Sequence, residues 1–281
     1  MQFVSWNMQK HNIVNSPVCN AFLKYLSETY DAVFIQEAAQ KLRDDDYFNN
    51  LRIQKSEFGN TQDPRYACEN VIITALSARP TGRAFQSGGE SFRNSVTVNA
   101  GKCGGGIVDL YLSSFHATSS GQAGDNTSGF LKKGPSGDGV PETDYLWIVG
   151  ADFNVNTNAV RYYPNENYQY HHVNIMSTID QPRGSGVMTH QKKDVLDGFY
   201  VGSNVTVNKK PSAVLLLDEN NIKTKIVAGS NSNGGDGFFV YIDMYGVKGE
   251  ERLSDHAPVV IEVSLPTVNS TILSSETKVS K

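Results

Sequence analysis

The chain has 281 residues, of which 39% are hydrophobic and 19% charged, so it can bury a substantial core and is too apolar to be wholly disordered. Its formal net charge of −4 at pH 7 excludes a generally basic nucleic-acid coat protein, but not a nuclease, because a metal-dependent site gathers carboxylates. No apolar run reaches the roughly 18–20 residues that span a bilayer, and we expect no transmembrane segment.

Short strand-like runs separated by Gly, Asn and Pro recur along the chain, and few segments have helical periodicity. Apolar residues at helical spacing predict an amphipathic helix packed on a sheet over residues 22–30, and a weaker helix over 42–51. In chain order, the predicted elements are strand 3–8, helix 22–30, strand 32–36, helix 42–51 and strands 70–76, 95–99, 107–114, 145–150, 195–201 and 259–263.

The remaining segments indicate how the chain is organised. Residues 119–143 are rich in Gly, Ser and Asp, and residues 156–193 are rich in Tyr, Asn, His and Gly, so both predict long loops. No repeat and no linker divides the chain, and we expect one domain over residues 1–266 with a flexible Ser/Thr/Lys-rich tail over 267–281. No signal peptide is visible before the first predicted strand, although a removed leader would leave the same start.

The cysteines are too few for a disulfide framework. The chain has three, Cys19, Cys68 and Cys103. Either all three are unpaired, small apolar residues, or one bridge forms and leaves a spare thiol. The sequence leaves both alternatives open.

Several predicted strands adjoin residues that are typical metal ligands or acid–base groups. A single Glu or His next to a strand is usually a turn or capping residue. Several such junctions together predict one shared site, because one rim of a sheet sandwich can gather side chains from many strands. The junction residues are Asn7, Glu37, His116, Asp152, Asn154, Asp197, Asp255 and His256.

These residue types suit phosphodiester hydrolysis. Mg²⁺ prefers oxygen ligands and is typically held by one or two carboxylates plus the substrate phosphate. Attack on phosphorus needs a water deprotonated by a base that works near neutral pH, which favours His, and a carboxylate bonded to that His fixes its tautomer. Neutral amides such as Asn can hold phosphoryl oxygens without adding repulsive charge.

The motifs resemble, in order, those of the endonuclease/exonuclease/phosphatase superfamily, and the resemblance spans residues 3 to about 265. Within it the chain most resembles the catalytic B subunit of cytolethal distending toxin, a deoxyribonuclease I-like member. The similar segments are WNMQ at 6–9, QEA at 36–38, SFHA at 114–117, GDN at 124–126, GADFN at 150–154, VLD at 195–197 and SDHAPV at 254–259.

The resemblance implies a fold and a metal site. The fold would be a four-layer α/β sandwich of two mixed β-sheets face to face, flanked by helices, in one deoxyribonuclease I-like catalytic domain over residues 1–266. Glu37 resembles the principal Mg²⁺ ligand, with Asn7 and Asp255 beside it, and Mn²⁺ or Ca²⁺ would be substitutes.

The same resemblance implies catalytic roles. Asp152 and Asn154 resemble the pair that places the nucleophilic water and the scissile phosphate. His256 resembles the catalytic His, which Asp197 holds. His116 resembles a second His that contacts the phosphate or assists proton transfer.

Two further residues are implied to contact substrate phosphate, Arg93 and Asn126. The chain also departs from the toxin pattern. Val155 stands where relatives usually have Arg, one extra residue lies between Gly150 and Asp152, and the segment 38–78 is shorter. These departures weaken DNA as the preferred substrate and leave the metal and hydrolysis predictions intact.

The sequence therefore predicts a Mg²⁺-dependent phosphodiesterase, a DNA endonuclease of the toxin B-subunit type that cleaves by His-activated attack of water on phosphorus. The resemblance implies secretion, delivery by binding subunits, and action on DNA in a host-cell nucleus. One alternative is a phosphatase acting on a phosphoinositide or other phosphomonoester, with lysine pairs at 132–133, 192–193 and 209–210 as a basic pocket. A second alternative is a non-catalytic binding module.

Overall fold

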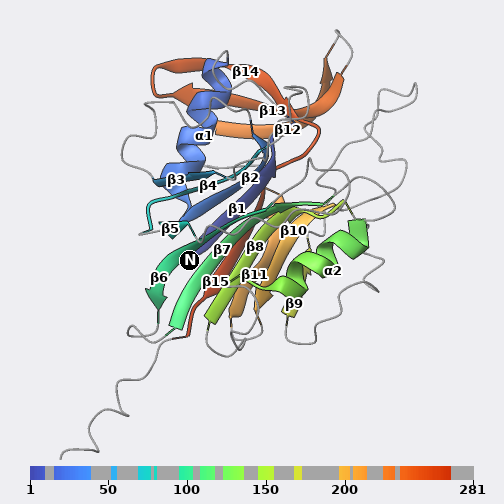
Figure 1. Cartoon of the computed structure of the whole chain (residues 1–281). Helices are drawn as coiled ribbons and strands as arrows, with labels where there is room; N and C mark the ends of the chain where they lie inside the picture. Colours follow the sequence, from blue (N-terminus) through green and yellow to red (C-terminus); the bar gives the residue numbers. More distant parts are fainter. Residues whose placement is uncertain are drawn as a thin grey trace, which may run out of the picture.

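The computed structural model describes residues 1–9, 16–38, 52–55, 69–76, 79–80, 95–103, 108–117, 123–135, 145–154, 168–172, 196–202, 205–213, 224–231 and 235–266. Two six-stranded sheets pack face to face, and one helix covers the outer face of each (Figure 1). This confirms the predicted four-layer α/β sandwich of two mixed sheets. The predicted helix 42–51 and the predicted tail 267–281 lie outside the described residues.

The first sheet contains, in spatial order, β11 (Thr206–Ala213), β15 (Val259–Ser264), β1 (Gln2–Asn7), β2 (Ala32–Ala38), β4 (Glu69–Thr74) and β3 (Arg52–Lys55). Its one parallel pair, β1 with β2, is joined through helix α1 (Pro17–Thr29), as a parallel crossover requires. The helix begins where its N-cap Ser16 accepts a hydrogen bond from the Cys19 N–H, with proline at the first helical position.

The second sheet contains β5 (Arg79–Pro80), β6 (Ser95–Cys103), β7 (Val108–His116), β8 (Tyr145–Asp152), β10 (Asp197–Gly202) and β9 (Tyr168–His172). Its one parallel pair, β7 with β8, is joined through helix α2 (Ala123–Lys133). The prediction of long loops was therefore wrong in part of both segments. Helix α2 lies within 119–143, because Phe130 and Leu131 anchor a Gly- and Ser-rich segment to the sheet, and β9 lies within 156–193, paired with β10.

A third, antiparallel sheet was not predicted. It contains β12 (Thr224–Asn231), β13 (Gly235–Met244) and β14 (Val247–Ser254). It lies beside α1 in Figure 1, and Phe238, Val240 and Ile242 of β13 join the same apolar cluster as the helix. The run Phe-Phe-Val-Tyr-Ile at 238–242 has the high β-propensity that would have identified the central strand.

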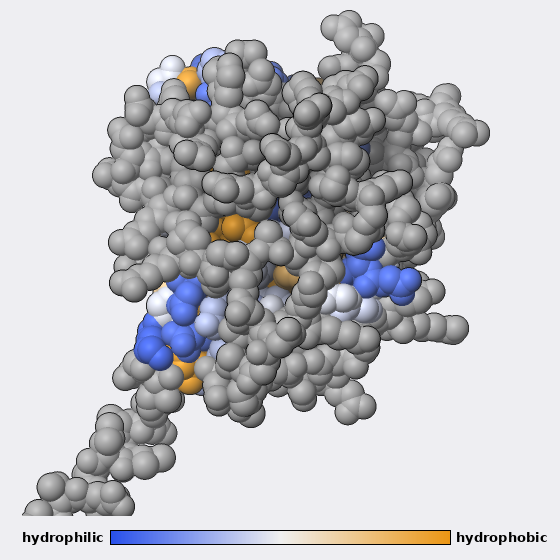
Figure 2. Space-filling model, viewed as in Figure 1, coloured by the Kyte–Doolittle hydropathy of each residue, from blue (hydrophilic) through white to orange (hydrophobic). Residues whose placement is uncertain are grey.

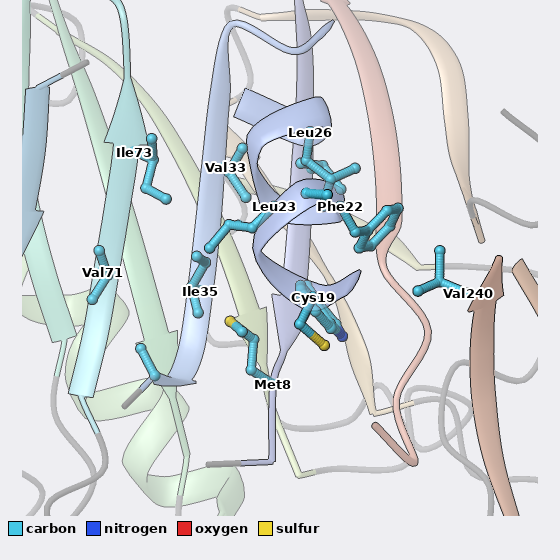
Figure 3. Packing of buried hydrophobic residues seen from close by; sticks show 14 of the residues in the cluster. Met8, Cys19, Phe22, Leu23, Leu26, Val33, Ile35, Val71, Ile73 and Val240 are labelled. Carbon is cyan, nitrogen blue, oxygen red and sulfur yellow. The ribbon is translucent and has the colours of Figure 1, made fainter. Parts of the chain in front are cut away.

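Three apolar clusters separate the layers. One cluster lies between the two six-stranded sheets. Another lies under α2, where Phe115 stacks on Phe130 with ring centroids 4.4 Å apart. The cluster under α1 is shown in Figure 3, where Phe22, Leu23 and Leu26 of the helix face the strands. Neither described helix has the length and apolarity that a membrane span requires.

Along the strands that lead to the site, the residues facing the opposite sheet change from large apolar residues to small Ser or Gly and then to ionisable or amide groups. Alternate residues of a strand point to the same face, so each series can be followed in steps of two. The series are Phe3, Ser5 and Asn7 on β1; Leu112, Ser114 and His116 on β7; and Ile148, Gly150 and Asp152 on β8.

The surface and the thiols complete the description. On the face shown in Figure 2, the coloured residues are mostly blue and hydrophilic, with small orange apolar areas between them. Cys19 and Cys103 are both free thiols, which excludes a bridge between them, and Cys68 lies outside the described residues. Burial raises the pKa of the Cys19 thiol to about 12.

Candidate active site

The predicted site residues gather at one rim of the sandwich, three from neighbouring strands of the second sheet. His116 at the end of β7 is in register with Asp152 at the end of β8. Asp197 at the start of the antiparallel β10 is in register with the same Asp152. The three side chains therefore share the face that looks toward the first sheet.

The first sheet supplies the opposing residues. Asn7 ends β1, and Glu37 lies near the end of the neighbouring parallel strand β2. Asp255 and His256 precede β15, which runs antiparallel to β1, so the start of β15 lies beside the end of β1. Strand direction thus brings together residues that the sequence keeps far apart.

His256 and Asp197 form a buried hydrogen-bonded pair. Nδ1 of His256 lies 2.8 Å from Oδ2 and 3.0 Å from Oδ1 of Asp197. Asp197 is fully buried, and His256 is 7% exposed. The structure therefore contains the contact that the resemblance implied between residues 197 and 256, and it directs Nε2 of His256 toward the centre of the site.

Asp152 occupies that centre. Its Oδ2 accepts a hydrogen bond from Asn7 Nδ2 at 2.8 Å and lies 3.4 Å from Nε2 of His116 and 3.9 Å from Nε2 of His256. Its Oδ1 accepts from the Asn154 backbone N–H at 2.9 Å. One carboxylate oxygen thus faces both imidazoles, while the other is held by the turn that follows β8.

A backbone irregularity turns Glu37 into the site. Its φ is +53°, which is uncommon for a residue other than glycine, and the pairing of β2 with β4 shifts register between Ile35 and Ala38. Such bulges redirect a side chain. Oε1 of Glu37 lies 3.7 Å from Nε2 of His116, on the same imidazole nitrogen that Asp152 faces.

Ser254 fixes the segment that carries Asp255 and His256. Its hydroxyl donates to the Asn7 carbonyl at 2.8 Å and accepts from the His256 N–H at 3.0 Å. Oδ1 of Asp255 lies 3.7 Å from Nε2 of His256 and keeps partial exposure. The segment with Asp255 and His256 is therefore held against the end of β1.

Burial and charge shift the pKa values of the central pair upward. Burial, together with the nearby Asp197 carboxylate, raises the pKa of Asp152 to about 7, although His256 and the donors Asn7 and Asn154 act in the opposite direction. Burial alone would lower the pKa of His256, but the carboxylates of Asp197, Asp152 and Asp255 outweigh it and raise this pKa to about 10. The site holds more carboxylate than cationic charge, an excess that a bound cation would relieve.

The donor set fits a hard divalent cation. The carboxylate oxygens of Glu37 and Asp152 converge beside Nε2 of His116, and carboxylate oxygen is the ligand type Mg²⁺ prefers. Asn7 Oδ1 accepts from the Gln9 N–H and has a second lone pair for a ligand bond. Ligand atoms of Asp152, Asp197 and His256 also lie within 4.8 Å of one another, although the bond between the last two already uses them.

Three further predicted site residues remain, of which the structure describes Asn154 and Asn126. Nδ2 of Asn154 donates to the Ala117 carbonyl, so this side chain ties the end of β7 to the turn after β8. Asn126 is on α2, not in a loop, and is 9% exposed. Arg93 and Val155 lie outside the described residues.

A neutral hydrogen-bonded layer behind the site was missed at the sequence level. Nε2 of Gln36 donates to Ser114 Oγ at 3.0 Å and to the Gly150 carbonyl at 3.3 Å, and so joins the two sheets. The single hydroxyl hydrogen of Ser114 has two acceptors within reach, the Ile35 carbonyl at 2.9 Å and Oδ1 of Asn70 at 3.1 Å. The two-residue alternation of the strands could have revealed this layer, because it places Gln36 and Ser114 on the faces that look toward the opposite sheet.

Comparison with known proteins identifies the fold. No protein-family model matches the sequence, and no curated protein matches it. Among solved structures, an endonuclease/exonuclease/phosphatase family protein from Bacteroides thetaiotaomicron has a TM-score of 0.63 at 12% identity, over 95% of this chain and 98% of the other. The mannosyl-6-phosphatase of the same organism has 0.62 at 13%, over 94% and 100%. D. rerio TDP2 with a single-strand DNA product has 0.57 at 12%, over 94% and 98%.

At these identities the similarity shows the fold alone, and it agrees with the two-sheet sandwich that the motif resemblance implied. None of the three is a toxin subunit. The finer resemblance to the cytolethal distending toxin therefore stays a prediction.

Proposed function

We propose that the protein is a divalent-metal-dependent phosphoester hydrolase, and specifically a DNA endonuclease of the cytolethal distending toxin B-subunit type. One observation carries the proposal. His256 is bonded through Nδ1 to the buried Asp197, and its Nε2 faces Asp152 in a group that also holds His116 and Glu37. A base with a buried carboxylate behind it and a second carboxylate in front suits the activation of water.

His256 acts as the base in this mechanism. Asp197 fixes the tautomer that leaves Nε2 as the proton acceptor and stabilises the imidazolium that forms. Asp152 accepts from the water and holds it in line with the phosphorus, while Asn7 and the Asn154 N–H hold Asp152 in place. Glu37, Asn7 and Asp255 would hold Mg²⁺, with Mn²⁺ or Ca²⁺ as substitutes, and the bound ion would supply positive charge to the phosphoryl oxygens and favour the neutral form of His256.

His116 completes the site opposite. Its Nε2 faces Asp152 and Glu37 at 3.4 and 3.7 Å, and the residue is 2% exposed. A protonated imidazole there donates to a phosphoryl oxygen as negative charge develops on it. Asn154 and Asn126, with Arg93, belong to the same proposal as phosphate contacts.

The substrate is the finer part of the proposal. The motif resemblance supports DNA, and so does the similarity to D. rerio TDP2, whose structure holds a single-strand DNA product. Delivery by toxin binding subunits, secretion and action in a host nucleus rest on the motif resemblance alone. The similarity to a mannosyl-6-phosphatase favours a second candidate, hydrolysis of a phosphomonoester.

The deciding experiment compares two reactions of the purified protein. We expect supercoiled plasmid to be nicked with Mg²⁺ and not with EDTA, and nicking to be lost in His256→Ala. Phosphate release from mannose 6-phosphate and from inositol phospholipids is measured in parallel. Phosphate release without nicking would replace the endonuclease by the phosphatase, and neither reaction with any divalent metal would overturn the proposal.

A further inference from the structure

Two chain segments run side by side at the rim of the proposed active site. The Ser254 hydroxyl donates to the Asn7 carbonyl at 2.8 Å. A second bond joins the same two segments. Gln9 stands two residues after Asn7, and its Oε1 accepts a hydrogen bond at 3.2 Å from Nη1 of Arg252, which stands two residues before Ser254. Arg252 is therefore about two strand residues, roughly 7 Å, from the level of Asn7.

The residues become more exposed from the Asn7–Ser254 bond to the Gln9–Arg252 bond. Asn7 and Ser254 are buried, Gln9 is exposed, and Arg252 is half-buried. The guanidinium thus lies at the accessible edge of the site, where a part of the substrate beyond the reacting phosphate would pass.

The fold holds the Arg252 side chain in position. It packs over Gly237 of β13, where an added Cβ would lie 2.6 Å from Nε of Arg252. Its partner Gln9 is also fixed, because the Gln9 backbone has φ +51° and its N–H donates to Oδ1 of Asn7 at 2.9 Å. Asn7 in turn donates to Asp152, so one chain of hydrogen bonds connects the guanidinium to the centre of the site.

The chemistry of the side chain points to an anion. A guanidinium presents five N–H donors in a planar fork that matches phosphate oxygens, and Gln9 is one partner of this guanidinium. The site beside it is acidic, with Asp152 and Asp255 near His256 and Glu37 near His116. A substrate with several phosphates needs positive charge at this rim, where those carboxylates would otherwise repel it.

We propose that Arg252 binds a second phosphate of the substrate, adjacent to the one that is hydrolysed, and so selects substrates with neighbouring phosphates. This inference rests on the proposed phosphoester hydrolase function. The second phosphate is that of the next nucleotide in a polynucleotide, or a further phosphate group on a small molecule.

The test measures kcat/KM on substrates with and without a second phosphate. The probes are a single-stranded oligonucleotide, bis(p-nitrophenyl) phosphate with one phosphodiester, and fructose 1,6-bisphosphate against fructose 6-phosphate. We expect Arg252→Gln to lower kcat/KM for the oligonucleotide about tenfold relative to kcat/KM for bis(p-nitrophenyl) phosphate, mainly by raising KM. The same substitution should reduce the slope of log binding constant against log salt concentration for the oligonucleotide by about one unit. A fall confined to the bisphosphate pair would assign the second phosphate to a small molecule.

Two variants separate charge from structure. Arg252→Lys keeps the charge, so it should keep the salt slope and recover part of the oligonucleotide KM. Lys248→Gln removes an exposed cation of the same strand that pairs with Asp243 at 2.7 Å, and should leave the substrate ratio as in the wild type. Gln9→Ala removes the partner of Arg252 and should raise KM for the oligonucleotide by a smaller factor.

Some outcomes would overturn the inference. Equal loss on all substrates in Arg252→Gln would make Arg252 a structural residue, and unchanged ratios and salt slopes would remove it from the substrate path. Failure of the proposed function is distinguishable, because the wild-type protein would then hydrolyse none of the probes.

Discussion

The space between the two six-stranded sheets has two ends of opposite chemistry, although the same strands build both. At one end, the ring of Phe34 packs against two others: Phe3, tilted at a centroid distance of 6.0 Å, and Phe199, edge to face at 6.2 Å. At the other end Asp152 and His256 are buried to a similar extent but carry ionisable groups. The strand alternation is common to both ends, and only the side chains on the inward face differ.

The comparison shows that the apolar end stabilises the fold, whereas the polar end holds the ionisable groups of the candidate site. Each CH₂ group buried at the apolar end contributes about 0.8 kcal/mol to folding, whereas the polar end is stable only where its groups are hydrogen-bonded. The neutral layer of Gln36 and Ser114 meets that condition within the protein. The ionisable end relies in addition on paired charges and, in our proposal, on a metal ion.

The largest expected effect is on the rate. His256→Ala and Asp197→Asn should each lower kcat by about 10³–10⁴-fold, and the double variant should lose little more, because the two residues act as a unit. The measurement is single-turnover cleavage at saturating Mg²⁺, with circular dichroism to check folding. Losses that multiply in the double variant would show that Asp197 serves only the structure.

The next largest effect tests whether the charged end binds a metal ion. Glu37→Gln should raise the Mg²⁺ concentration needed for half-maximal activity by about 10–100-fold, because it removes a charged oxygen ligand. A Mg²⁺ titration of the rate measures this. Glu250→Gln, which removes an exposed carboxylate of β14, is the control, and an equal shift in both variants would contradict the assignment.

A third substitution tests packing where the two ends meet. A Cβ added at Gly150 would lie 2.5 Å from Cδ2 of Phe34, so Gly150→Ala should lower the free energy of unfolding by about 1–3 kcal/mol. Gly249→Ala is the matched control, because its Cβ would meet only the Val18 side chain, at 3.2 Å. Urea unfolding measures both, and equal effects would mean that the interface relaxes around Gly150.

The smallest effect is a pH dependence of the metal-free protein. The pKa of Asp152 is raised to about 7 and that of His256 to about 10, both above their ordinary values, so both groups favour folding most in their protonated forms. Their stabilisation is complete below the ordinary pKa of each group and is lost as pH rises through the shifted value.

In EDTA, the wild type should therefore lose on the order of 1 kcal/mol more stability than His256→Gln between pH 6.5 and 10. Urea unfolding across this range measures the difference, and Mg²⁺ should reduce it by compensating the carboxylates. A wild type that gains stability relative to the variant as pH rises would contradict the charge balance described for the site.

Much of the fold was predictable because its signals are local. The predicted strands over 3–8, 32–36, 145–150 and 259–263 correspond to β1, β2, β8 and β15, with ends that differ by a few residues. In each, β-branched and aromatic residues run up to a polar stop. Helix α2 escaped prediction because glycine and serine weaken its helical signal, and its stability comes from Phe130 and Leu131 against the second sheet.

The sequence by itself predicted the members of the candidate site, since Asn7, Glu37, His116, Asp152 and His256 stand beside strands in an ordered set of motifs. Only the tertiary structure decided which of them touch. The bond from His256 to Asp197 joins residues 59 positions apart, and the contact of Arg252 with Gln9 joins residues 243 apart. Strand alternation determines the face of a side chain, but its partner depends on how sheets pair and pack, which no local pattern specifies.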